Sequence, residues 1–306
     1  MGLALKVAPY KGWQHCLHAS NGRLKLIASL DVGPRLLHFG FEGGPNELYE
    51  ARGDAGKRGG PQWRFYGGHR LWVAPEKAPY VPDNAPVAWE PLPNGFRLTQ
   101  RPERSSGLQK QLDFKLKPGA ARVQVIHRLF NRSRQTRRWA PWAMTVLKAG
   151  GKIIVPFPPR ISFPKQLLPS SALALWPYTD LSDPRWSFGP QGLLFTAQAS
   201  RQAPQKLGAY VPNGWAAYAR GRHLFVKAFK PGPKEGLSDF MANVELWGRG
   251  PMVELETLGP VATLRPGASV EHEERWALLD GFSVPKNVDD AWKRLVPKMK
   301  PLVRNF

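Results

Sequence analysis

The ten residues Gly67 to Glu76, with the sequence GGHRLWVAPE, bring several chemically capable groups together. His69 can give or take a proton near neutral pH, and Arg70 offers a fixed fork of hydrogen-bond donors. A sugar ring presents hydroxyls to charged side chains and apolar C–H faces to aromatic rings such as that of Trp72. The segment therefore suits a sugar site, and a loop histidine bonded to backbone is the structural alternative.

The second set of candidates is a pair of acids in the segment Met252 to Leu258. Because side chains alternate across a strand, Glu254 and Glu256 project to one face, and the residues between them project to the other. Two carboxylates on one surface can provide acid and base groups for proton transfer. If that face were exposed to solvent, the pair would carry no functional meaning.

A predicted loop offers three more polar side chains. Asp180, Asp183 and Arg185 follow the aromatic residues Trp176 and Tyr178. An aspartate in such a loop can accept hydrogen bonds from sugar hydroxyls, and a self-satisfied Asx turn is an equally simple interpretation. The three residues are expected to contribute to substrate binding.

Polar residues on predicted strands complete the candidate substrate-binding set. Asn243 and Glu245 share one strand face with Trp247, which adds a stacking surface. Lys227 would favour a negatively charged ligand if it lay in a cleft, whereas a lysine on a strand edge is usually solvated. Two further candidates flank the proline-rich loop after His69 and are expected to close the pocket: Glu76 and Asn84.

Short runs with a period of two dominate the chain and predict the strands that would position these groups. Asn-Gly, Pro-Gly and Gly-Gly pairs bound the runs and predict hairpin turns. The predicted strands are Leu24–Leu30, Ala121–Phe130, Trp142–Leu147, Leu193–Ala199, His223–Phe229, Asn243–Trp247 and Met252–Leu258. Such spacing without alternating helices indicates an all-β sandwich. One amphipathic helix is expected at Val288–Val296, ended by Pro297 and Pro301.

Several segments between about Trp13 and Leu278 resemble the galactose mutarotase-like superfamily, and within it a bacterial domain family of unassigned function. The matching segments are NGRLKLIASLDVGPRLLHFGFEGGPNELYE, GGHRLWVAPE, YVPDNAPV, VIHRLFNRS, APWAMTVLKAGG, LALWPYTDLSDPRW, NGWAAYARGRHLFVKAF, ELETLGPVATLRPG and EHEERWAL. The resemblance implies one large antiparallel β supersandwich over residues 1–306, with a helical tail at 282–306. It also implies a ligand on the concave face of the sandwich.

The resemblance implies roles for three residues. Mutarotases take their base from the glutamate of a Leu-Glu-Thr motif, which Leu255-Glu256-Thr257 matches, so Glu256 is the expected base. They also carry a histidine and an arginine in an early loop, which makes His69 the expected acid and Arg70 a substrate-binding residue. Glu254 is then expected to support the base.

The chain departs from the mutarotase pattern at the second site histidine. Mutarotases place it in an Asn-His-x-Tyr-Phe-Asn segment, but the corresponding region here reads APWAMTVLKAGG. Trp142 lies near that position, where it can line a site but cannot donate a proton as an acid. His127 shares a strand face with Val123, Val125 and Leu129, which favours a satisfied core histidine. The departure puts ordinary epimerase activity in doubt.

Composition sets the remaining expectations. The net charge is +21, and residues 101–138 carry eleven Lys or Arg against Glu103 and Asp113. This charge favours anionic partners, whereas no nucleic-acid-binding motif is legible, so only nonspecific binding to nucleic acid is expected. Cys16 is the single cysteine, which excludes an intrachain disulfide. Neither a metal-ligand motif nor a phosphate-binding glycine loop occurs, so no metal and no cofactor are expected.

The amino-terminal segment lacks the features of an export leader, and no run approaches the ~18 apolar residues of a membrane span. A cytoplasmic location is therefore expected, or a periplasmic or secreted one if a leader was removed. Three functions remain open. The first is a carbohydrate-binding protein that acts as an aldose 1-epimerase on a neutral or anionic mono- or oligosaccharide, the second a non-catalytic sugar-binding or sensing module, and the third a polyanion-binding protein.

Overall fold

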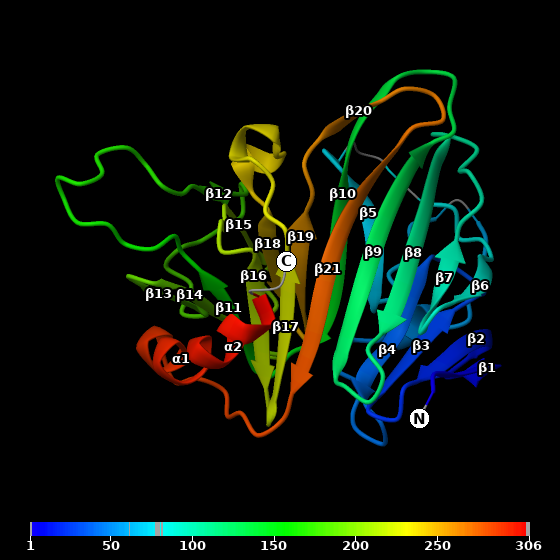
Figure 1. Cartoon of the computed structure of the whole chain (residues 1–306), viewed down its shortest axis with the longest axis horizontal. Helices are drawn as coiled ribbons and strands as arrows, with labels where there is room; N and C mark the ends of the chain where they lie inside the picture. Colours follow the sequence, from blue (N-terminus) through cyan, green and yellow to red (C-terminus); the bar gives the residue numbers. More distant parts are fainter. Residues whose placement is uncertain (1, 61, 77–79, 81, 304–306) are drawn as a thin grey trace. The chain divides into compact units, whose positions relative to one another are not determined.

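The computed structural model describes residues 2–60, 62–76, 80 and 82–303. Strands hold 48% of the chain and helices 8%, and the strands pair in two antiparallel sheets, as expected for an all-β protein. The chain divides into two compact units (Figure 1). Unit 1 comprises residues 1–147 and 261–273, and unit 2 comprises residues 148–260 and 274–306. The interpretation of residues 1–306 as one domain stays a prediction.

Unit 1 contains two runs of antiparallel strands. The first run, in order of pairing, is β1 (Ala4–Tyr10), β2 (Trp13–Ser20), β3 (Leu24–Ser29), β4 (Arg35–Phe41), β5 (His69–Ala74), β10 (Arg137–Lys148) and β20 (Ala262–Leu264). The second run is β6 (Ala88–Leu92), β7 (Gly95–Thr99), β8 (Leu108–Leu116) and β9 (Arg122–Asn131). A short 3-10 helix, η1 (Arg52–Asp54), lies in the connection between β4 and β5.

Alternating burial along β8 and β9 shows how these strands form one wall of the core. Apolar side chains of β8 point inward at every second position, as the period of two requires. Leu112 lies opposite His127 in the β8–β9 register, so the histidine projects into the interior with Val125 and Leu129. The predicted inward face of β9 is confirmed.

Unit 2 also contains two antiparallel runs. One is β19 (Met252–Leu258), β18 (Val244–Arg249), β15 (Gln205–Ala209) and β12 (Leu173–Leu175). The other is β13 (Trp186–Gly189), β14 (Gly192–Thr196), β11 (Gly151–Pro156), β16 (Trp215–Arg220), β17 (His223–Phe229) and the second half of β21 (Ser269–Leu279). Residues 269–273 of β21 belong to unit 1. The short 3-10 helices η2 (Lys234–Gly236) and η3 (Asp239–Met241) precede β18.

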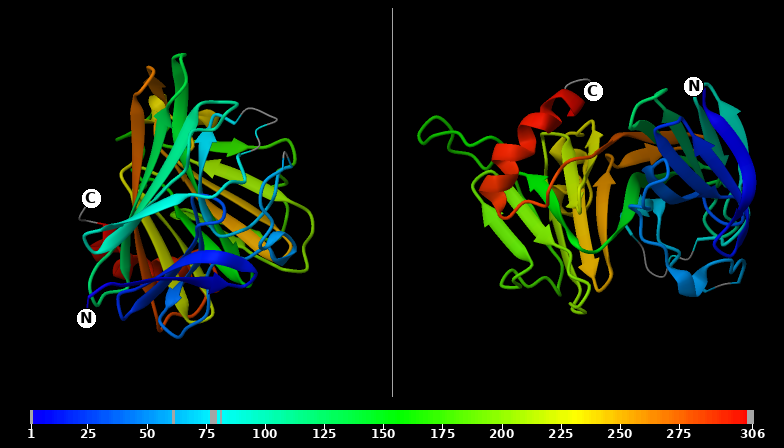
Figure 2. Two further views of the ribbon diagram at one scale, coloured as in Figure 1. Left: turned by 90° about the vertical axis from the view of Figure 1, so that its right-hand side faces the viewer. Right: turned by 90° about the horizontal axis from the view of Figure 1, so that it is seen from below.

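Two helices form the carboxyl-terminal tail, α1 (Val288–Arg294) and α2 (Val296–Val303), and they lie against the strands of unit 2 (Figure 2). The Asn287 side chain caps α1 by accepting a hydrogen bond from the amide of Asp290. The expected helix is confirmed as α1, which ends at Arg294, shortly before Pro297, but the expectation that Pro301 breaks the helix is wrong. Pro297 lies in the first turn of α2, where its missing N–H costs little, and Pro301 lies inside α2. Residues 304–306 of the predicted tail lie outside the described part.

The predicted strands are confirmed at all seven positions, with ends that differ by a few residues. Their hairpin turns fall where the Asn-Gly and Pro-Gly pairs predict them, including residues 94–95 between β6 and β7 and residues 118–119 between β8 and β9. None of the helices in the described ranges has the length and apolar character that crossing a membrane requires.

Candidate functional site

The most reactive arrangement in unit 2 is built on two neighbouring strands. Glu245 of β18 and Glu256 of β19 lie directly opposite each other in the strand register, and both side chains are fully buried. Like charges that face each other across strands repel, and burial removes the water that would screen them. The protein therefore needs a cation beside this pair, and the interpretation of this face as solvated is excluded.

Lys206 of β15 supplies that cation. Its Nζ lies 2.8 Å from Oε2 of Glu245 and 3.3 Å from Oε2 of Glu256, so one ammonium group bridges both carboxylates. We call Lys206, Glu245 and Glu256 the carboxylate–lysine cluster. Because β15 pairs with β18, and β18 with β19, three adjacent strands each contribute one member of the cluster.

Burial and charge shift the proton affinities within the carboxylate–lysine cluster. Burial lowers the pKa of Lys206, but the two glutamates outweigh burial and hold this pKa above its usual value. Burial raises the pKa of Glu245 well above its usual value, and the charge of Glu256 adds to this effect while Lys206 opposes it. Glu245 is thus a carboxyl group that can retain a proton where an ordinary glutamate would be ionised.

Aromatic side chains surround the carboxylate–lysine cluster. The half-buried Trp176 ring lies 4.6 Å from Nζ of Lys206, within range of a cation–π contact. Tyr178, which is 43% exposed, is hydrogen-bonded to the half-buried Trp247. Polar groups beneath partly exposed rings are the combination that grips a sugar by its hydroxyls and its apolar face.

Gly208 packs closely against the residues around Trp176. It faces Glu245 in the β15–β18 register. A Cβ atom at this position would meet the Ala242 side chain at 2.9 Å and the Trp176 ring at 3.4 Å. A side chain at Gly208 would therefore displace Ala242, whereas its contact with Trp176 would be of ordinary length.

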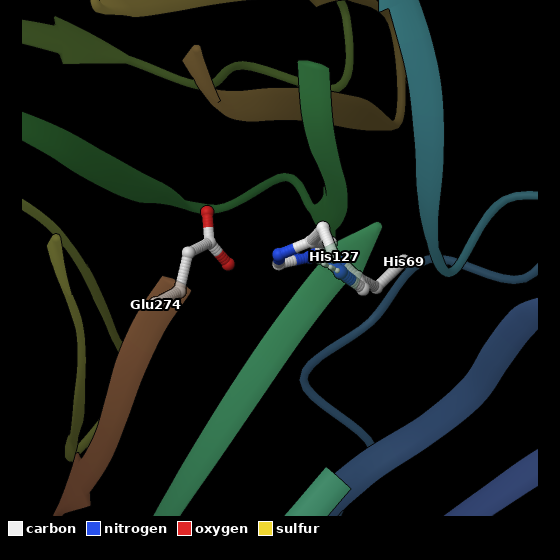
Figure 3. Close-up of side chains that lie close together, drawn as sticks. All are labelled: His69, His127 and Glu274. Atoms are coloured by element: carbon white, nitrogen blue, oxygen red, sulfur yellow. Dashed lines mark hydrogen bonds between the residues drawn. The ribbon is translucent and has the colours of Figure 1, made fainter. Parts of the chain in front are cut away.

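Unit 1 contains a second polar group in its core, a pair of buried histidines (Figure 3). Nε2 of His69 lies 2.8 Å from Nε2 of His127, and Nδ1 of His69 lies 2.9 Å from Oγ1 of Thr145. Nδ1 of His127 lies 2.9 Å from the carbonyl oxygen of His272. The prediction of a buried, hydrogen-bonded His127 is confirmed, and its partnership with His69 was not foreseen.

These contacts fix where the protons sit when both rings are neutral. A carbonyl oxygen only accepts, so Nδ1 of His127 carries a hydrogen and its Nε2 is an acceptor. Nε2 of His69 must then donate to His127, and Nδ1 of His69 accepts from the Thr145 hydroxyl. The two imidazoles therefore form a directed proton chain, and both nitrogens of His69 are engaged within unit 1.

Glu274, also drawn in Figure 3, belongs to β21, and its partners include three donors of unit 2. Nζ of Lys227 lies 2.8 Å from it, Nε1 of Trp276 donates to it at 2.7 Å, and the Thr257 hydroxyl donates a short hydrogen bond. Lys227 is fully buried and also donates to the Leu255 carbonyl. The charge of Lys227 is matched by Glu274, and its role in attracting a ligand stays a prediction.

Arg70 and Trp142 lie on paired strands of unit 1. The Arg70 guanidinium lies 5.6 Å from the Phe65 ring and 5.5 Å from the Trp72 ring. Trp142 faces Trp72 in the β5–β10 register and is buried. Glu76 accepts a hydrogen bond from Nε1 of Trp72, so these strands share an aromatic and polar cluster.

The predicted loop residues of unit 2 bond to one another or to nearby backbone. Asp180 accepts hydrogen bonds from the amide and hydroxyl of Ser182, which is the Asx turn that the sequence left open. Asp183 pairs with Arg185 through Nε and Nη2, and Arg185 is fully buried.

Two amides of the predicted set are also engaged. The Asn243 side chain bonds to both the amide and the carbonyl of Val211, which anchors a loop. Asn84 donates to the Gln62 carbonyl and its own carbonyl accepts from the amide of Gly59, so it too holds backbone in place.

Sequence reasoning missed Lys206, the central residue of the carboxylate–lysine cluster. Its segment QKLGA has no motif and no distinctive spacing. Only the pairing of β15 with β18 brings Lys206 to Glu245, which lies 39 positions later in the chain. A buried lysine cannot be recognised from sequence without its partner strand.

No protein-family model and no curated protein matches this sequence. Solved structures do match. A candidate aldose 1-epimerase from Klebsiella pneumoniae aligns over 97% of this chain and 87% of its own, with TM-score 0.60 and 14% identity. A galactose mutarotase-like protein from Clostridium acetobutylicum aligns over 91% of this chain and 99% of its own, with TM-score 0.57 and 11% identity.

A TPR-domain containing protein from Parabacteroides distasonis is similar over 99% of this chain, with TM-score 0.57 and 15% identity. This chain spans 62% of the length of that protein. Identities this low carry fold and not activity. The chain has the galactose mutarotase-like fold, an antiparallel β supersandwich, as its sequence resemblance implied.

Proposed function

We propose that this protein binds a carbohydrate at the carboxylate–lysine cluster of unit 2. The observation that supports this is a buried carboxylate pair, Glu245 and Glu256, bridged by Lys206 beneath the partly exposed Trp176. Charged side chains that the fold holds in fixed positions offer strong, oriented hydrogen bonds to sugar hydroxyls, and the tryptophan ring supplies an apolar contact.

The proposal includes aldose 1-epimerase chemistry with the predicted roles of Glu256 and His69. Glu256 removes the proton of the anomeric hydroxyl, and His69 gives a proton to the ring oxygen, so the ring opens to the aldehyde. Rotation about the bond to the anomeric carbon and reclosure then invert this centre. When the ring closes, the hydroxyl formed from the ring oxygen returns its proton to His69, and Glu256 returns its proton to the carbonyl oxygen. Both groups regain their starting protonation states, so the step needs no cofactor.

A non-catalytic sugar-binding module is the second candidate, and one observation favours it. Both ring nitrogens of His69 are already bonded within unit 1, to His127 and to Thr145. An acid in this state must give up one hydrogen bond before it can reach a substrate. The joint action of His69 and Glu256 on one sugar therefore stays a prediction.

Anomer exchange measured by NMR separates the two candidates. Freshly dissolved α-glucose and α-galactose are expected to equilibrate faster with the protein, and Glu256→Gln is expected to remove about 10²-fold or more of that acceleration. Glu235→Gln, an exposed acid in η2 of the same unit, is the matched control and retains the rate.

Saturable sugar binding that Glu256→Gln weakens, without any acceleration, would establish the module and contradict the epimerase. The absence of both binding and acceleration with neutral and acidic monosaccharides would contradict the carbohydrate proposal as a whole. Far-UV circular dichroism of each variant checks that the fold is retained.

A further inference from the structure

A basic hollow lies in unit 1, and its lining shares no residue with the carboxylate–lysine cluster. Its volume is about 810 Å³, and its lining includes Arg58, Arg101, Arg104, Asn84 and Ser105. We call it the arginine hollow. A volume of this size lies in the range of ~300–1,000 Å³ that ligand sites occupy.

Two of the arginines at this hollow carry uncompensated charge. Arg101 and Arg104 are exposed, and within residues 2–60, 62–76, 80 and 82–303 neither has a hydrogen-bond or ion-pair partner. Arg58 differs, because it pairs with Asp31 at 3.1 Å. The hollow therefore presents two guanidinium forks to solvent with their donors available.

The one acid between these arginines is turned away from them. Glu103 is buried and accepts hydrogen bonds from Tyr80 at 2.7 Å and from Nζ of Lys110 at 3.0 Å. Gln100 and Ser106 also donate to it. The Glu103 carboxylate thus forms an ion pair with the buried Lys110, and it does not neutralise the charges of Arg101 and Arg104.

A smaller cavity of about 30 Å³ shares three lining residues with the arginine hollow: Pro82, Asp83 and Asn84. Its own lining includes Arg35, Arg70 and Lys110, and all three are at least nine-tenths buried. Asp83 is the one acid that lines either space within the described part of the chain. Lys110 is paired with Glu103, so the buried guanidinium groups of Arg35 and Arg70 are what this cavity adds to the attraction for an anion.

The chemistry of the lining selects the class of ligand. Guanidinium forks bind phosphate, sulfate and carboxylate groups with paired hydrogen bonds. A site for single-stranded nucleic acid typically also has exposed aromatic rings on which the bases stack. Tyr80 is the one aromatic ring in the described lining, and it is already held by Glu103 and by the edge of Trp72, 4.8 Å away between ring centroids.

We propose that the arginine hollow binds the oxyanion groups of an acidic oligosaccharide, with Arg101 and Arg104 as the contacting residues. That the ligand is a saccharide rests on the proposed function, whereas the recognition of oxyanions rests on the arginine hollow alone. The arginine hollow then indicates that the saccharide is acidic, which the carboxylate–lysine cluster by itself does not determine.

Isothermal titration calorimetry on the full chain tests this proposal. The probes are a sulfated heparin-derived hexasaccharide, a galacturonate hexamer, neutral maltohexaose, inorganic phosphate and a short single-stranded DNA. The test variant is R101Q/R104Q. The control is R134Q/R138Q, which removes the same charge from two exposed arginines of unit 1 that lie outside the lining.

At least one acidic hexasaccharide is expected to bind saturably. R101Q/R104Q is expected to weaken its affinity about tenfold or more, because it removes direct contacts to the oxyanions. R134Q/R138Q removes the same net charge without these contacts and is expected to weaken the affinity by less than about threefold. Equal weakening by both variants overturns the proposal, as does the absence of saturable binding of either acidic hexasaccharide. DNA or phosphate that binds as tightly as the hexasaccharides overturns the choice of a saccharide.

Glu256→Gln distinguishes this proposal from the proposed function. If Glu256→Gln abolishes the binding of neutral monosaccharides, and only R101Q/R104Q abolishes the binding of the acidic hexasaccharide, both proposals are supported. If Glu256→Gln leaves the binding of neutral sugars unchanged while R101Q/R104Q still lowers the affinity for the acidic hexasaccharide, the proposal for the carboxylate–lysine cluster is contradicted and the proposal for the arginine hollow is supported.

Discussion

Lys206 decides whether the carboxylate–lysine cluster can exist. Two fully buried glutamates that face each other would each pay a large cost of desolvation and repel one another. The single ammonium group at 2.8 and 3.3 Å opposes both effects. In the proposed complex, a sugar hydroxyl would compete for groups that are already oriented, which favours specific over nonspecific binding.

Replacing this lysine should destabilise the protein strongly. Lys206→Met removes the counter-charge of two buried carboxylates and is expected to lower the free energy of unfolding by about 3–5 kcal/mol at about pH 8. Urea denaturation measures the change. Lys230→Met, at an exposed position of unit 2, should change stability by less than about 0.5 kcal/mol.

The loss from Lys206→Met should depend on pH. The pKa of Glu245 is raised in the folded state, so the proton that it takes up stabilises the fold at low pH, and this stabilisation is lost as pH rises through the folded pKa. The destabilisation at about pH 5.5 should thus be smaller than at about pH 8. An equal loss at both values would show that the glutamates are not what Lys206 compensates.

At the level of secondary structure, strand pairing brings residues that are distant in the sequence into one site. The β18–β19 hairpin aligns Glu245 with Glu256, and a slip of one residue would carry the whole β19 face to the other side of the sheet. Gly250, with φ of +52°, occupies the turn that sets this register. The hairpin is thus the element that fixes the distance between the two carboxylates.

The helical tail completes the core of unit 2. Leu295, between α1 and α2, is fully buried with Val288, Ala291 and Met299 against strand residues such as Trp215. Leu295→Ala should lower the free energy of unfolding by about 2–5 kcal/mol, because it leaves a cavity under both helices. Chemical denaturation tests this, with the exposed Lys293→Ala of α1 as control. A loss below about 0.5 kcal/mol would mean that the helices pack loosely on unit 2.

Charge governs the behaviour of the whole molecule. With a net charge of +21, the chain repels itself, and protonation of carboxylates adds to that repulsion. Burial raises the pKa of Asp113, but hydrogen bonds from Arg97 and Arg128 outweigh burial and hold this pKa below its usual value. Asp113 accordingly contributes stability above the unfolded pKa of about 3.9, and the contribution is lost as pH falls through the folded pKa.

The protein should therefore unfold more easily at about pH 3 than at about pH 6. Because salt screens the self-repulsion, about 0.5 M NaCl should recover part of the loss. Asp113→Asn should show a smaller difference between the two pH values than the unaltered chain, and Asp239→Asn, in the short helix η3 of unit 2, should not. Thermal unfolding at both pH values and both salt concentrations measures these differences. A difference unchanged by Asp113→Asn would contradict the assigned role of this carboxylate.

The sequence by itself determined the architecture. Alternating side chains and turn pairs predicted the strands, because a strand with one buried face must repeat with a period of two. The motif segments implied the galactose mutarotase-like fold, and the pattern of β9 predicted a buried His127. These properties depend on residues close together in the chain.

Only the tertiary structure decided which polar residues act together. It brought Lys206 to two glutamates, joined His127 to His69, and matched the charge of Lys227 with Glu274. It also turned Glu103 away from its neighbours and left Arg101 and Arg104 unmatched. Such partnerships join residues that are distant in sequence, and burial sets their strength. Neither the pairing of distant residues nor their burial is encoded in local spacing, so no pattern within a single segment can reveal these partnerships.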